Sequence, residues 1–138
     1  MNRIVLIFFL AFFASFKPYK GVEITFKNDT QEDFKMLKVS VDGEEFKFLN
    51  LNRGEKTKPI SVKETYWFCE TTAITQKDTV MFTGFCAVGE TLIKDGELMI
   101  SYTIFPKKGE SRRLVANEVI YSGSAKNVGF SKITWEEK

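Results

Sequence analysis

The sequence of 138 residues contains no histidine, only two cysteines and only three prolines. Without histidine it lacks the commonest general base, the commonest metal ligand and the usual partner of a nucleophilic serine or cysteine. The chain also lacks a large excess of charge of either sign, because twenty basic and eighteen acidic residues leave a net charge of only +2. Nucleic-acid-binding proteins are far more basic than this, so we expect no nucleic-acid partner.

Sequence motifs of catalysis are absent as well. The chain has no Gly-x-Ser-x-Gly elbow, no Ser-x-x-Lys, no phosphate-binding loop and no dinucleotide-binding glycine pattern. The carboxylates of Asp29, Glu32 and Asp33, and those of Glu44 and Glu45, lie in turn-like segments and lack the order of a calcium loop. We interpret them as solvated, and predict a non-enzymatic protein without cofactor or metal.

A long apolar run occurs only at the N-terminus. The thirteen residues 4–16 follow Arg3 without a charged residue and end before Lys17-Pro18. A short basic start followed by about 7–15 apolar residues is typical of a secretory signal peptide, whereas a membrane-spanning helix needs about 20. We predict a signal peptide over residues 1–16, cleaved between 14 and 21, and a secreted or periplasmic protein. Membrane contact is expected only through this segment, if it stays uncleaved.

The rest of the chain has the pattern of an all-β domain. Apolar residues alternate or form short runs, and turn signals recur about every ten residues, with no sustained helical period. We predict one domain over residues 22–136 with about nine strands, at 22–26, 34–41, 44–49, 55–62, 65–72, 79–88, 97–105, 114–121 and 128–135.

One turn and one proline indicate how the predicted strands are arranged. Asp42-Gly43 is a favoured two-residue hairpin turn, and folding the chain there places Val39 opposite Phe46 and Leu37 opposite Phe48. Pro59 marks an edge strand, because proline cannot donate a ladder hydrogen bond. Since a closed barrel has no edges, the pattern favours an antiparallel two-sheet sandwich of immunoglobulin-like architecture over an up-and-down, lipocalin-like barrel.

The two cysteines are interpreted as a disulfide. Sixteen residues separate Cys69 from Cys86, which excludes a thioredoxin-like motif, and two thiols without histidine do not make a zinc site. If Lys77-Asp78 formed a two-residue turn, Cys69 and Cys86 would face each other across an antiparallel strand pair, close enough to bond. Ala73 would then lie opposite Phe82. Export to an oxidising compartment would favour this disulfide.

Two sequence features could mark surface function. The densest positive patch, formed by Lys107, Lys108, Arg112 and Arg113, could meet an anionic glycan or an acidic protein. Asn28-Asp29-Thr30 fits the acceptor pattern for N-glycosylation, although asparagine and aspartate also favour turns. We expect a binding or accessory module for a protein or glycan partner at the cell envelope or outside the cell. The alternative is a barrel that carries a small apolar ligand.

Overall fold

The computed structural model describes residues 21–67, 69–82, 91–109, 111–126 and 128. These residues form eight strands and no helix: β1 (Val22–Asn28), β2 (Phe34–Val41), β3 (Glu44–Leu51), β4 (Ile60–Val62), β5 (Glu70–Ile74), β6 (Thr79–Phe82), β7 (Gly96–Phe105) and β8 (Arg113–Ser122). The predicted all-β class is therefore confirmed. The predicted signal peptide and residues 129–135 of the predicted ninth strand lie outside the described residues.

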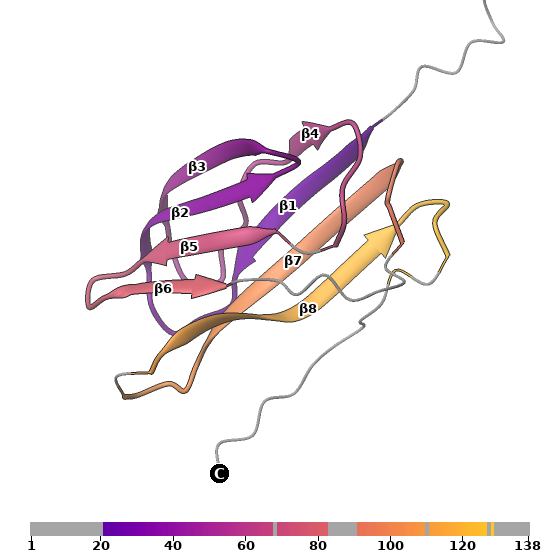
Figure 1. Ribbon diagram of the computed structural model, residues 1–138. Helices are drawn as coiled ribbons and strands as arrows, with labels where there is room; N and C mark the ends of the chain where they lie inside the picture. The colour runs from indigo at the N-terminus through magenta and orange to yellow at the C-terminus, as the bar shows by residue number, and fades with distance from the viewer. Residues whose placement is uncertain (1–20, 68, 83–90, 110, 127, 129–138) are drawn as a thin grey trace, which may run out of the picture.

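The eight strands form two four-stranded sheets, in the orders β4-β1-β7-β8 and β3-β2-β5-β6 (Figure 1). The described strand pairs are antiparallel except β1 with β7, which run parallel at the centre of the first sheet. The prediction of an antiparallel sandwich was therefore wrong for this pair, because β1 and β7 lie far apart in the sequence and no hairpin turn sets their relative direction. The two layers are consistent with a β-sandwich. Within the described part of the chain, no helix is long and apolar enough to cross a membrane.

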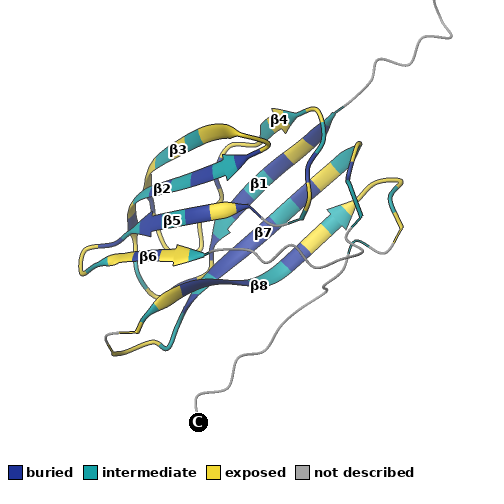
Figure 2. Ribbon diagram, viewed as in Figure 1, coloured by how far each residue is buried: buried dark blue, intermediate teal, exposed yellow. Residues whose placement is uncertain are grey.

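The hydrophobic core is formed by buried residues of both sheets (Figure 2). Along β1 these buried residues alternate with more exposed ones, as successive side chains of a strand point to opposite faces. In the first sheet, Phe26 of β1 and Tyr102 of β7 are fully buried, with ring centroids 6.3 Å apart. Phe48 of β3 packs against Phe26, and Phe82 of β6 packs against Tyr102, so aromatic rings join the layers. The Tyr102 hydroxyl and Thr71 Oγ1 of β5 are hydrogen-bonded at 2.7 Å across the same core.

The β2–β3 hairpin forms as the sequence predicts. Val39 pairs with Phe46 and Leu37 with Phe48. The turn residues have positive φ angles of 49° at Asp42 and 80° at Gly43. Aspartate and glycine tolerate this left-handed conformation better than other residues, and a tight hairpin turn of this type requires it at both positions.

The predicted edge strand at 55–62 is shorter in the structure. Regular pairing with β1 is confined to β4 at the sheet edge, although Lys56 forms an isolated bridge to Lys27. The Thr57 amide donates to the Phe26 carbonyl at 2.8 Å, so the segment does follow β1 before the ladder breaks. The break falls at Pro59, which has no amide hydrogen to donate.

The β5–β6 pair contradicts the predicted register. Ala73 pairs with Val80, not with Phe82, and Ile74 pairs with Thr79, so the ladder is shifted by two residues. The cause is the position of the turn, which spans residues 75–78 and is centred one residue earlier than predicted. In this turn the Thr75 amide donates to the Asp78 carbonyl at 2.9 Å. The Thr75 hydroxyl stabilises this turn by accepting hydrogen bonds from the amides of Lys77 and Asp78.

Candidate functional site

The loops gather at the two ends of the strands, and each end carries its own polar cluster. One end holds the 42–43 turn and the segments before β5 and β7, and the opposite end holds the 29–33, 75–78 and 106–112 connections (Figure 1). The first end contains a cavity, and the second contains a network of ion pairs. We treat them in turn.

The cavity has a volume of about 510 Å³ and opens to solvent. Its wall combines the β2–β3 turn, the segment at 64–66, the start of β5 and Leu92. Three acidic residues, Asp42, Glu64 and Glu70, line the cavity, one from each of the first three elements. Backbone hydrogen bonds of 2.9 and 2.8 Å between Thr65 and Ile93 hold the wall in place.

The remaining lining is less polar. Tyr66 is 42% exposed, whereas Cys69 is only 2% exposed. Burial raises the pKa of the Cys69 thiol to about 12, against a smaller lowering by a hydrogen bond with Thr65. A thiol with so high a pKa is almost wholly protonated at neutral pH and is a poor nucleophile. Among the described residues, no group of three acidic or sulfur ligands could hold a metal ion.

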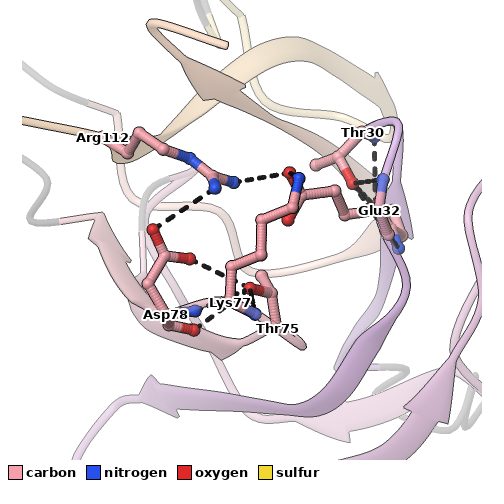
Figure 3. A network of polar contacts seen from close by, with 7 residues as sticks. Thr30, Glu32, Thr75, Lys77, Asp78 and Arg112 are labelled. Carbon is pink, nitrogen blue, oxygen red and sulfur yellow. Dashed lines mark hydrogen bonds and ion pairs between the residues drawn. The ribbon is translucent and has the colours of Figure 1, made fainter. Parts of the chain in front are cut away.

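The opposite end is organised by Arg112, which follows the 106–109 turn and points between two carboxylates (Figure 3). Its side chain is only 7% exposed, and its guanidinium lies 2.8 Å from Glu32 and 3.4 Å from Asp78. Lys77 also binds Glu32, at 2.9 Å, but remains 66% exposed. The ion pairs join connections from both sheets, which gives Arg112 a structural role.

The ion pairs set the protonation of Glu32. Burial raises its pKa, but the hydrogen bonds and charges of Lys77 and Arg112 lower it by more, and the net pKa lies below the ordinary value of 4.5. The interpretation of Glu32 as a solvated loop carboxylate was therefore wrong, since its side chain is only 17% exposed.

The predicted positive patch is divided in the structure. Lys107, Lys108 and Arg113 are exposed, whereas Arg112 turns away from solvent and is neutralised by Glu32 and Asp78. Arg112 therefore does not belong to a surface that an anionic partner could contact. The remaining three residues stay a predicted patch.

The predicted disulfide remains a prediction. Cys69 is a buried free thiol in the structure, and Cys86 lies outside the described residues. The geometric argument for the bond is weakened, because the described β5–β6 ladder does not have the register on which it depended.

In this fold the Asn28 side chain is buried and hydrogen-bonded, so it is not accessible as a glycosylation acceptor. It is fully buried, and its Nδ2 donates to the carbonyls of Glu32 and Leu51 at 2.8 and 3.1 Å. Its Oδ1 accepts from the amide and the hydroxyl of Thr30. The side chain thus ties the end of β1 to the following loop and to the end of β3.

Sequence reasoning singled out Cys69, as half of the predicted disulfide, but not the acidic and aromatic residues of the cavity. Asp42 was recognised only as a turn former, and Glu64, Tyr66 and Glu70 carried no motif. Their segments are separated along the chain and meet only because β2 and β5 are neighbours, with Ser40 paired to Glu70. No linear signal could have identified them.

Comparison with known proteins gives no functional assignment. No family model matches the chain, and no curated protein matches it. A solved structure described as "NMR structure of the protein from Eubacterium rectale" is similar, with 20% identity and a TM-score of 0.45. The match covers 74% of this chain and 93% of that chain.

Proposed function

We propose that this chain is an exported, non-catalytic β-sandwich of immunoglobulin-like architecture that binds a protein or glycan partner through the loops at its cavity end. The observation that carries the proposal is the open cavity of about 510 Å³. Its volume lies within the range of about 300–1,000 Å³ that is typical of ligand sites. Its walls come from loops and strand ends held by two sheets, which is how rigid scaffolds commonly present binding residues.

The apolar-ligand carrier has less support. A carrier needs interior space between its strands, but the described inner faces are occupied by large side chains, including the fully buried Phe26, Phe34 and Tyr102. Titration with oleate, followed by tryptophan fluorescence, separates the two functions. A binding module should show no saturable quenching, whereas saturable quenching would favour the carrier.

The test of the binding function uses a photo-crosslinking residue at the cavity rim. Tyr66→p-benzoylphenylalanine keeps an aromatic ring at a position that is 42% exposed, and Ile120→p-benzoylphenylalanine, on β8 at 48% exposed, is the matched control. We expect irradiation in the native host to give a discrete adduct from position 66 and none from position 120. Excess unmodified protein should compete for that adduct. Equal labelling at both positions would contradict a partner site at the cavity.

Export is tested by the intact mass of the protein from its native host, after alkylation in denaturant with and without prior reduction. We expect a mass that lacks the N-terminal segment, with cleavage between residues 14 and 21, and two thiols that react only after reduction. A full-length mass with two free thiols would argue against both the signal peptide and the Cys69–Cys86 disulfide.

A further inference from the structure

The cavity has an unbalanced charge. Among the described residues that line it, Asp42, Glu64 and Glu70 are acidic and none is a lysine or an arginine. In the described part of the chain, none of these three carboxylates takes part in an ion pair, although carboxylates elsewhere, such as Glu32 and Glu45, are paired with the protein's own lysines or arginine. The negative charge of the cavity is therefore available to a ligand.

The shape of the cavity favours an extended organic cation over a bare metal ion. Asp42, Glu64 and Glu70 all line the cavity, but no group of three ligands among the described residues could hold a metal ion. Val41 and Leu92 add apolar surface, and Tyr66 adds an aromatic ring. This combination suits a lysine or arginine side chain, whose alkyl stem packs on apolar surface while the charged end meets carboxylates or an aromatic face.

The open form of the cavity indicates how the cation arrives. The cavity opens to solvent, whereas sites for free small molecules usually enclose about 70–90% of the ligand surface. A side chain that projects from a protein segment needs less enclosure, since the segment itself covers the mouth. Partly exposed carboxylates of one sign also attract a cationic segment before contact.

We propose that the cavity receives a lysine or arginine side chain from a basic peptide segment of the partner protein. This inference rests on the proposed binding function and specifies its ligand. Asp42, Glu64 and Glu70 bind the cationic end group, and Tyr66, Val41 and Leu92 contact its stem.

The test is an NMR titration of the isotope-labelled full chain with the peptide acetyl-Gly-Lys-Gly-amide. We expect saturable shifts of the backbone amides of Asp42, Gly43, Thr65 and Glu70, with a dissociation constant on the order of 1 mM for so small a probe. The same peptide carrying N-acetyl-lysine has the stem without the charge and should give no saturable shift. Added salt should weaken binding of the charged peptide.

Charge-neutral variants locate the interaction. Asp42→Asn keeps a residue that tolerates the positive φ of the turn, and Glu70→Gln keeps the side-chain length. Each should weaken binding about two- to fivefold, as expected for loss of one exposed ion pair. Glu23→Gln, at an exposed position of β1 outside the cavity lining, should leave the affinity unchanged.

Three results would overturn the inference: no saturable shift with the lysine peptide, equal binding of the acetylated peptide, or affinities unaffected by the cavity substitutions. If one of these occurs while the Tyr66 crosslink to a partner persists, the cationic ligand is wrong and the binding function stands. If the crosslink fails as well, the proposed function fails with it.

Discussion

At the scale of single residues, Arg112 is the side chain that joins the loops of Glu32 and Asp78 at one end of the sandwich. Its guanidinium is nearly buried and contacts Glu32 and Asp78 from two different loops. A buried ion pair adds little when compared with apolar packing, but removal of one partner leaves the other charge buried without compensation. Glu32 would then keep only the exposed Lys77.

We therefore expect Arg112→Met to lower the free energy of unfolding by about 2–3 kcal/mol. Its neighbour Arg113 is exposed and offers a matched control, because Arg113→Met should change stability by no more than about 0.5 kcal/mol. Chemical denaturation of the three proteins measures the difference. Equal stability of the two variants would show that the ion pairs do not support the loops.

The same network predicts a pH dependence. Because the folded-state pKa of Glu32 is lowered from 4.5, its stabilising contribution is present above the unfolded pKa and is lost as the pH falls through the folded pKa. At neutral pH the parent protein should therefore have a higher free energy of unfolding than Glu32→Gln. This difference in free energy should become smaller once the pH falls below 4.5. Urea denaturation at a series of pH values checks this. A gap that stays constant into the acid range would contradict the assignment.

Cys69 allows a second test at this scale. In the Cys86→Ser variant, Cys69 is the one remaining cysteine. Burial raises its pKa from 9.0 to about 12, so its thiolate fraction near pH 8 should be about a thousandfold below that of an unperturbed thiol. We expect very slow alkylation by iodoacetamide in the folded protein and rapid alkylation in denaturant. Fast alkylation of the folded protein would show that the thiol is accessible.

At the scale of the elements, local chemistry explains which strand pairs the sequence predicts. The β2–β3 register follows from Asp42-Gly43, whose turn type is set by two adjacent residues. The β5–β6 register depends on where the turn lies, and the Thr75 hydroxyl stabilises the turn at residues 75–78 by accepting from two amides. Hydrogen bonds from one side chain favour this position over a turn centred on Lys77-Asp78, and no dipeptide preference reveals them.

Alanine substitutions at two glycines distinguish the loss of stability caused by backbone strain alone from the loss caused by strain together with a steric clash. Gly43 has a φ of 80° with open space around it, so Gly43→Ala should lower stability by about 1 kcal/mol through conformation alone. Gly96 has a φ of 89°, and a Cβ there would also collide with the carbonyl of Ser122 across the β7–β8 ladder. Gly96→Ala should therefore cost more, about 2–4 kcal/mol. Thermal unfolding gives the order, and a smaller loss for Gly96→Ala would refute this account.

At the scale of the whole molecule, the two sheets are joined by aromatic packing and by buried polar contacts, such as the one between Tyr102 and Thr71. Their hydroxyls meet at 2.7 Å between the layers, and Thr71 also donates to the Cys69 carbonyl at 3.0 Å. This contact links the central strand β7 to β5, the strand that borders the cavity.

A double-mutant cycle tests whether the hydroxyls of Tyr102 and Thr71 interact. Tyr102→Phe removes the hydroxyl and keeps the ring, and Thr71→Val removes the other partner with little change in shape. We expect each single change to cost about 1 kcal/mol and the double change to cost less than their sum. Chemical denaturation of the four proteins gives the interaction energy. Strict additivity would mean that the two hydroxyls do not interact.

The sequence by itself determined the all-β class and the β2–β3 register, because these depend on alternation and on adjacent turn residues. Tertiary structure decided the rest. Arg112 meets Glu32 across 80 positions of sequence, so a patch that looked basic became a neutralised network. The cavity carboxylates come together only because β2 and β5 pair. Contacts between distant segments depend on which strands become neighbours, and local residue preferences contain no information about that choice.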